Sequence, residues 1–159
     1  MERDDLTQRD GQYLKAVYVL GGREEAVGPA MLARRMDVSR VGALKKMRRL
    51  TSMGYGEYLN NKGFLLNEAG IQAIQTEMRR HHVIEKFLQI SLEMESEKAC
   101  DESSRVGQYM SRETIDNMSE RLGDELTCEC GCCIEPPYEP EDLMHCHWVR
   151  KQMKVKPEG

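Results

Sequence analysis

Potential metal ligands are concentrated in one part of this 159-residue sequence. The stretch CECGCCIEPPYEPEDLMHCHW, residues 128–148, holds five of the six cysteines and two of the four histidines. Thiolates and imidazoles at this density are typical of a metal centre or a thiol switch. In a reducing compartment, clustered cysteines act as metal ligands or redox thiols more often than as structural disulfides. We therefore expect a centre of this kind, and the rest of the chain indicates what it controls.

The spacing of these residues leaves three kinds of centre open. Cys130 and Cys133 form one C-x2-C pair, but no second pair follows and the run does not match a ferredoxin pattern. An iron or iron–sulfur centre that responds to iron or redox state, a structural zinc site and a metal-free thiol switch all remain possible. The candidate ligands in this segment are Cys128, Cys130, Cys132, Cys133, Cys146, His145 and His147.

The first half of the chain has the pattern of a DNA-binding module. Hydrophobic periodicity predicts a helix over residues 7–20, a short helix that begins at Pro29, and a third helix that follows the cap Ser39 and ends at Gly54. Strand-forming residues on both sides of the turn 60–63 predict a β-hairpin over residues 55–67. Three helices followed by a hairpin are typical of a winged helix-turn-helix, whose third helix enters the major groove.

The second half is predicted to be helical as far as Gly123. Helices are expected over residues 67–92, 97–108 and 111–122, with apolar faces that pack on each other and on a partner subunit. The fold class is therefore mainly α, with an N-terminal winged helix-turn-helix followed by a helical dimerisation domain. The expected boundaries are 1–66 for the winged helix, 67–123 for the helical domain, and 124–159 for a cysteine-rich metal-binding segment with a basic tail.

The third helix is predicted to separate an apolar face from a basic one. Val41, Leu44, Met47 and Leu50 are expected to face the core, which leaves the basic side chains around the remaining arc. Residues 23–80 carry eleven Lys and Arg against six Asp and Glu, so this part of the chain is basic. The expected contacts to bases and phosphates are Ser39, Arg40, Lys45, Lys46, Arg49, Asn60, Asn61 and Lys62.

Composition argues against several classes of protein. No apolar run approaches the ~20 residues that a membrane span needs, and the start MERDDLTQRD is charged where a signal peptide would be apolar. A cytoplasmic protein that does not bind membranes is expected. A regulator of this kind needs no catalysis, so an enzyme is not expected.

The sequence resembles a known family. The segments YLKAVYVL, MLARRMDVSRVGALKKMRRLTSMGY, NKGFLLNEAG, RRHHVIEKFLQISL and ACDESSRVGQYMSRETIDNM are similar to the diphtheria-toxin-repressor and manganese-transport-regulator family, over about residues 7–122. The resemblance implies a homodimer whose two winged helices bind a palindromic double-stranded DNA operator once manganese or ferrous iron is bound.

The sequence also differs in places from the family that it resembles. Positions that help to build the family's activating metal site hold Gln12, Ser104, Gly107 and Gln108 here, which are poor transition-metal ligands. His81 and Glu85 survive from the family's pattern, one helical turn apart, and Cys100 replaces a histidine that contributes to a second site in some members. His81, Glu85 and Cys100 are therefore further candidate metal ligands.

These departures lead to a sequence-based hypothesis about function. We expect a homodimeric transcription regulator that responds to iron, an iron–sulfur cluster or redox state through its cysteine-rich centre. The alternatives are a manganese- or iron-dependent repressor with altered ligands and a structural zinc site, and a metal-trafficking or protein-docking module. Iron or an iron–sulfur cluster is the expected cofactor, zinc is the alternative, and manganese is less favoured.

Overall fold

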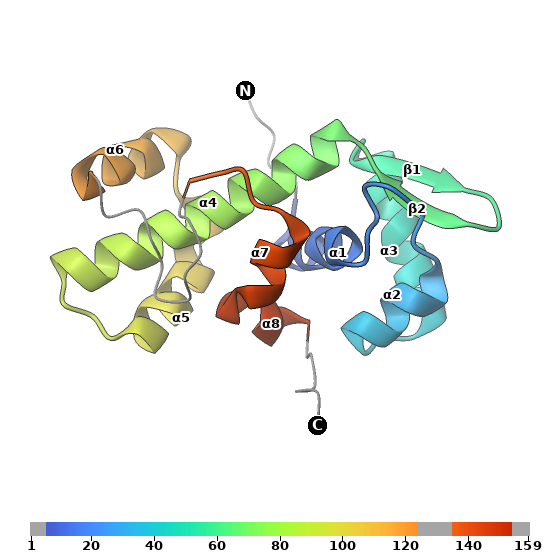
Figure 1. The fold of residues 1–159 in the computed structure, drawn as a ribbon, viewed down its shortest axis with the longest axis horizontal. Coiled ribbons are helices and arrows are strands. Elements are labelled where there is room, and N and C mark those ends of the chain that lie inside the picture. The colour runs from blue at the N-terminus through green and yellow to red at the C-terminus, as the bar shows by residue number, and fades with distance from the viewer. Residues whose placement is uncertain (1–5, 124–134, 154–159) are drawn as a thin grey trace. The chain divides into compact units, whose positions relative to one another are not determined.

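The computed structural model describes residues 6–123 and 135–153, which form two compact units (Figure 1). Unit 1 contains residues 6–74 and 139–153, and unit 2 contains residues 75–123 and 135–138. The fold is mainly helical, with a two-stranded hairpin after three helices, so the predicted fold class is confirmed. No helix within the described ranges has both the length and the apolar character that a membrane span requires.

Unit 1 begins with three helices whose limits follow local signals in the sequence. Helix α1 spans Gln8–Val19, α2 spans Pro29–Met36 and α3 spans Arg40–Ser52. Thr7 caps α1 by accepting a hydrogen bond from the backbone N–H of Asp10, and Ser39 caps α3 by accepting one from Gly42. Pro29 occupies the first turn of α2, where its missing N–H costs nothing.

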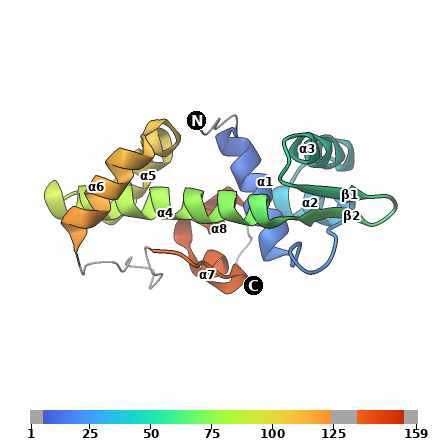
Figure 2. The same cartoon turned by 90° about the horizontal axis from the view of Figure 1, so that it is seen from above.

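The hairpin follows α3 directly, as predicted. Strand β1 (Gly56–Leu59) pairs antiparallel with β2 (Gly63–Leu66), and Figure 2 shows the hairpin beside α3. The backbone of Phe64 also exchanges two hydrogen bonds of 2.9 Å with Val27, just before α2. Gly63 has a φ of +127°, and a Cβ there would collide with the carbonyl of Val27. Glycine is therefore required where the hairpin is fastened to the segment before α2.

The apolar face of α3 differs from the predicted one at its first turn. Met47 and Leu50 are fully buried as expected, and Leu44 is half-buried. Val41, however, is 75% exposed, and Ala43 takes the buried position one turn before Met47. The expectation that Val41 faces the core is therefore wrong. Burial begins at Ala43, at the end of the first turn of α3, so Arg40 and Val41 before it remain open to solvent.

Two short helices that the sequence pattern did not predict complete unit 1. Helices α7 (Pro140–His145) and α8 (His147–Gln152) pack against α1. Trp148 is buried, and its ring lies 3.6 Å from the ammonium of Lys15, which is itself fully buried on α1. Arg23 forms a 3.2 Å ion pair with Glu139 at the start of this segment. Residues 139–153 are therefore part of the winged-helix unit.

Unit 2 is built on the second part of a long helix. Helix α4 spans Glu68–Ser91, and its residues from 75 onward belong to unit 2. Helix α5 (Ser96–Val106) runs into the single turn η1 (Gly107–Tyr109), and α6 spans Arg112–Leu122. Both views show α5 and α6 beside this part of α4 (Figures 1 and 2). Val83, Ile84, Ile115 and Leu122 form the core between them.

Polar contacts fix residues 135–138 to the same helices. Arg79 of α4 donates to Asp116 of α6 at 2.7 Å and to Glu135 at 2.9 Å. Burial alone would lower the pKa of Arg79, but these two carboxylates raise it, so the guanidinium stays charged. The backbone of Tyr138 exchanges two hydrogen bonds with the side chain of Gln75, at 2.6 and 2.7 Å. The chain is thus held on unit 2 just before it returns to unit 1.

The compact units are delimited differently from the three domains expected from the sequence, whose limits remain a prediction. The sequence analysis placed boundaries after residues 66 and 123, whereas the compact units divide within α4, after Ile74, and again after Tyr138. Helix α4 crosses the first limit without a break, because no glycine or proline interrupts it after Gly70. Within residues 124–159, which were expected to form a cysteine-rich metal-binding segment with a basic tail, the structure describes α7 and α8 as part of unit 1.

Candidate metal centre and nucleic-acid interface

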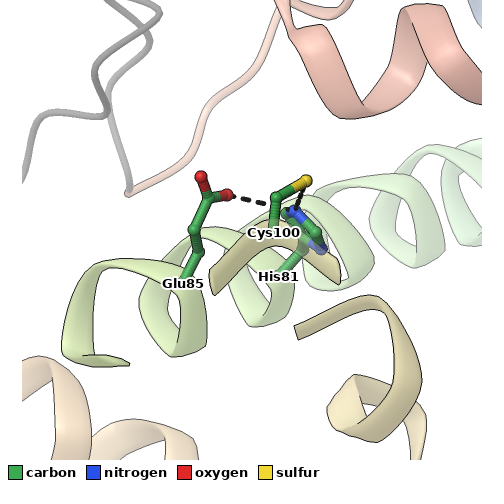
Figure 3. Close-up of side chains that lie close together, drawn as sticks. All are labelled: His81, Glu85 and Cys100. Atoms are coloured by element: carbon green, nitrogen blue, oxygen red, sulfur yellow. Dashed lines mark hydrogen bonds and ion pairs between the residues drawn. The ribbon is translucent and has the colours of Figure 1, made fainter. Parts of the chain in front are cut away.

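Three potential metal ligands from α4 and α5 meet inside unit 2. The imidazole of His81, the carboxylate of Glu85 and the thiol of Cys100 offer one ligand atom each, and these atoms all lie within 4.8 Å of one another (Figure 3). Nε2 of His81 is 3.1 Å from Oε2 of Glu85 and 3.6 Å from Sγ of Cys100. All three side chains are buried, with exposed fractions of 2%, 7% and 4%.

The positions of the three side chains follow from helix geometry. His81 and Glu85 are four residues apart on α4, so they lie on one face of the helix, one turn apart. Cys100 comes from the second turn of α5, which packs across that face (Figure 3). An imidazole, a carboxylate and a thiolate at these distances can bind one divalent transition-metal ion. The donor set therefore fits a metal ion, and it is the one such group of three within the described residues.

Side chains next to this group form hydrogen bonds to the backbone of α4 and α5. The hydroxyl of Ser103 on α5 donates to the backbone carbonyl of His81 on α4 at 2.7 Å. The hydroxyl of Ser104 donates to the carbonyl of Cys100 at 2.8 Å. His82 donates from Nδ1 to the carbonyl of Met78 at 2.7 Å, and its ring stacks on Tyr138. Ser103 therefore links α5 to α4 beside His81, whereas the bonds of Ser104 and His82 lie within their own helices.

Three other predicted metal ligands that the structure describes do not join this group. Cys146 is buried at the junction of α7 and α8 in unit 1, and His145 and His147 beside it are exposed. None of the three belongs to a cluster of potential ligands among the residues the structure describes. Four further candidates lie outside the described residues: Cys128, Cys130, Cys132 and Cys133. Gln12, at a position where the family has a ligand, accepts a hydrogen bond from Arg9.

Unit 1 presents a basic surface at the open end of α3. Ser39, Arg40 and Lys45 are exposed along its first half, together with the apolar side chain of Val41. Asn60, Asn61 and Lys62 are exposed in the turn between β1 and β2. A helix end with basic side chains beside a polar hairpin turn has the composition of a surface that binds the DNA backbone and reads base edges.

Lys46 and Arg49, two of the predicted phosphate contacts, also bind a buried carboxylate of unit 1. Asp10 of α1 is fully buried, and its carboxylate receives hydrogen bonds from Lys46 at 2.8 Å and from Arg49 at 3.0–3.2 Å. Burial alone would raise the pKa of Asp10, but the bonds from Arg49, Lys46 and Thr7 outweigh it and hold that pKa well below its usual range. These two cations therefore fasten α3 to α1.

Sequence reasoning missed Asp10 as the partner of α3. The only local signal was the spacing Thr7-x-x-Asp10, which is a capping box. The hydroxyl of Thr7 accepts a hydrogen bond from the backbone N–H of Asp10, and the backbone N–H of Thr7 donates to the Asp10 carboxylate at 3.0 Å. That motif explains why an acidic residue stands at Asp10. It does not reveal that the other side of the same carboxylate meets two cations of α3.

Two family models match adjacent parts of the chain. Residues 5–64 match the N-terminal DNA-binding domain of the iron-dependent repressors, and residues 67–136 match their metal-binding and dimerisation domain. Among curated proteins, the transcriptional regulators MntR of Salmonella typhimurium and of Escherichia coli O6:H1 are 29% and 31% identical over 85 residues. The matched region is 54% of this chain and 54% of each relative, so the chain spans about half the length of the curated relatives it matches.

Solved structures share the fold over a larger part of the chain. A hypothetical protein of Sulfolobus solfataricus has a TM-score of 0.73 at 21% identity, over 82% of this chain and all of that one. The metal-dependent transcriptional regulator MtsR has a TM-score of 0.66 at 26% identity, over 84% of this chain and 64% of its own. The manganese regulator SloR has a TM-score of 0.66 at 23% identity, over 84% of this chain and 64% of its own.

Proposed function

Because the chain belongs to the iron-dependent repressor family, we propose that it is a homodimeric transcription regulator whose affinity for DNA depends on a divalent metal ion held by His81, Glu85 and Cys100. The observation that carries this proposal is the buried group of three donors within 4.8 Å, in the part of the chain that matches the family's metal-binding domain. The names of the relatives support the same class, since MntR is a transcriptional regulator and MtsR a metal-dependent one.

The DNA side of the proposal rests on unit 1. Arg40 and Lys45 are exposed on the N-terminal half of α3, which supports a role as donors to base edges or phosphates. The exposed hairpin turn at residues 60–62 supports an extension of this surface. Lys46 and Arg49 form ion pairs with Asp10 of α1, which hold α3 on α1. In a homodimer two such surfaces would address two half-sites of a palindromic operator.

The three donors connect α4 and α5, and this connection suggests how metal could control the protein. A bound divalent ion would add a bridge between His81 and Glu85 on α4 and Cys100 on α5. Helix α4 continues without interruption from Glu68, which follows the hairpin, to these donors. If the bridged form of the helices is also the form that binds operator DNA, metal and DNA favour each other reciprocally, because coupling between two binding sites acts in both directions.

The experiment starts with selection of an operator from random duplex DNA by the metal-loaded protein. Fluorescence anisotropy then measures operator affinity with divalent metal or with a chelator, for the parent, His81→Ala and Glu85→Gln. Glu113→Gln, an exposed carboxylate on α6, is the matched control. We expect metal to tighten binding by about 5- to 150-fold in the parent and the control only. Equal affinity with metal and with chelator in the parent would refute the proposal.

Two further measurements test the other parts of the proposal. Salt dependence separates a DNA-binding protein from a protein-docking module, because released counterions make affinity fall steeply with salt concentration. Arg40→Ala together with Lys45→Ala should weaken operator binding and flatten that dependence. Sedimentation should give a dimer. A monomer at the concentrations used for DNA binding would contradict the two-half-site arrangement.

A second candidate function places the input in the cysteine-rich segment, as an iron, iron–sulfur or redox centre. The density of cysteines in CECGCC supports it, and those residues lie outside the described part of the chain. Replacing Cys128, Cys130, Cys132 and Cys133 with serine tests this candidate. If metal-dependent DNA binding survives in that variant, the segment is not the input. If it is lost while His81→Ala is without effect, the cysteine-rich centre replaces the first proposal.

A further inference from the structure

We infer that Cys100 makes the centre on α4 and α5 selective for an ion of the zinc class and poor for manganese. The inference rests on the proposed function, because it concerns the metal that His81, Glu85 and Cys100 would hold. It goes further by naming the residue that decides the choice of metal and the chemical property through which it does so.

The chemistry of the donors separates the two classes of ion. Thiolate is a soft ligand that suits zinc, whereas manganese is best served by carboxylate, carbonyl and water oxygens in six-coordinate geometry. Here the group contains one thiol, one imidazole and a single carboxylate, all buried. A set with sulfur, nitrogen and only one oxygen favours an ion that accepts four ligands of mixed softness, which zinc does in protein sites.

The distances between donors also match a small four-coordinate ion. An imidazole nitrogen and a thiolate sulfur bound to one zinc ion, at about 2.0–2.1 and 2.3 Å, lie about 3.5 Å apart in tetrahedral geometry. In this structure Nε2 of His81 and Sγ of Cys100 are 3.6 Å apart. For nitrogen and carboxylate oxygen the same geometry gives about 3.4 Å, and Nε2 of His81 and Oε2 of Glu85 are 3.1 Å apart. For these two donor pairs only small shifts are needed to bind such an ion, and all three donors lie within 4.8 Å of one another.

The surroundings limit how far this group can adapt to a larger set of ligands. The hydroxyl of Ser103 on α5 donates to the carbonyl of His81 on α4, so the two helices are held together beside the donors. The bond from Ser104 to the carbonyl of Cys100 lies within α5 and holds the side chain of Ser104 against its own helix. Within the described residues no other His, Cys, Asp or Glu completes a second group of potential ligands beside them. The centre therefore offers few of the oxygen ligands that manganese requires.

Cobalt(II) is the probe that reports the thiolate directly, because a cobalt–thiolate bond gives a charge-transfer band and four-coordinate cobalt gives intense visible bands. The experiment uses the full chain with Cys128, Cys130, Cys132 and Cys133 replaced by serine, so that Cys100 and Cys146 are the remaining cysteines. Cobalt is titrated into this parent and into Cys100→Ser, Cys100→Ala and Cys100→His forms of it. Cys146→Ser, which alters the other buried cysteine, is the matched control.

We expect the charge-transfer band in the parent and in Cys146→Ser, and its loss in both Cys100→Ser and Cys100→Ala, with circular dichroism unchanged. Zinc should displace cobalt stoichiometrically. Competition against a chelator should show that Cys100→His lowers the ratio of zinc affinity to manganese affinity by about tenfold or more. A band that survives Cys100→Ala, or a parent that binds manganese as tightly as zinc, would overturn the inference.

The outcomes also separate this inference from the proposed function. One outcome is that His81→Ala and Glu85→Gln abolish metal binding while Cys100→His leaves the ratio of zinc affinity to manganese affinity unchanged. That result would support the proposed metal site and refute the role of Cys100 in metal selectivity. If none of the three positions affects metal binding, both fall together.

Discussion

Replacing Asp10 with asparagine tests how α3 is held in place. The carboxylate is fully buried and receives hydrogen bonds from Lys46, Arg49 and the backbone of Thr7. Asparagine keeps the size of the side chain and one acceptor oxygen, but it removes the negative charge. Two cations would then lie against a neutral group, one of whose bonds to them must be lost.

The expected loss of stability follows from the exposure of the three groups. Removing one partner of a buried ion pair costs about 3–5 kcal/mol, because the other charge stays buried without compensation. The side chains of Lys46 and Arg49 are 20% and 46% exposed, so both can partly reach water. We therefore expect the lower end, about 3 kcal/mol. For a chain of this size that corresponds to a fall of about 6–12 °C in the midpoint of thermal unfolding.

The loss should also depend on pH, with a known sign. Burial raises the pKa of Asp10, and the hydrogen bonds from Arg49, Lys46 and Thr7 lower it by more, so the pKa in the folded protein is below the ordinary value of 3.8. A depressed carboxyl pKa stabilises the folded state fully above that ordinary value and ceases to do so as pH falls through the folded pKa. The difference between parent and Asp10→Asn should therefore be largest near neutral pH and shrink below about pH 4.

Urea unfolding followed by circular dichroism at pH 7, 5, 4 and 3 measures this difference. Glu57→Gln, which neutralises an exposed carboxylate on β1, is the control and should change the free energy of unfolding by no more than about 0.5 kcal/mol. The reasoning would be refuted if Asp10→Asn were as stable as the control at pH 7. It would also fail if the loss were the same at every pH, since a structural defect without an ionic origin would give that result.

Three further substitutions test other features of unit 1. Trp148→Ala should cost about 3–5 kcal/mol, because a buried aromatic ring leaves a cavity against Lys15; urea unfolding monitored by circular dichroism checks this, and a change under 1 kcal/mol would show that α8 is not packed on α1. Gly63→Ala should lower the thermal midpoint more than Gly21→Ala does, since both glycines have positive φ but only at Gly63 would a Cβ meet backbone. Val41→Ala should change the free energy of unfolding by no more than about 0.5 kcal/mol, because the side chain is exposed. A larger loss of stability would show that Val41 is buried in the core.

Features of the fold that depend on local sequence were predictable. The caps Thr7, Ser39 and Ser111 and the proline at the start of α2 mark helix ends through hydrogen bonds within a few residues, so the first six helices were found nearly at their observed limits. Features that depend on tertiary packing were not. Helices α7 and α8 are six residues each, too short for periodicity to reveal, although Pro140 followed by two acidic residues is an N-terminal signal.

In the candidate site, too, the contacts set by local sequence were predictable and those set by tertiary packing were not. His81 and Glu85 share a face of α4 because of helical spacing alone, so their proximity could be predicted. That Cys100 meets them depends on how α5 folds back onto α4, for which the sequence offered only the resemblance to a family. The partnership of Asp10 with Lys46 and Arg49 joins residues 36 and 39 positions apart, and no local pattern encodes it.

The discontinuity of unit 1 has a consequence for the order of events during synthesis. Residues 139–153, which pack on α1, leave the ribosome only after all of residues 75–138 have been made. When unit 2 has been synthesised, Lys15 and the α1 surface around it still lack their packing partner Trp148. Unit 2 is formed by one contiguous stretch of chain, so all the residues of its core are then present. On a nascent chain unit 2 can form first, and unit 1 reaches its complete packing last.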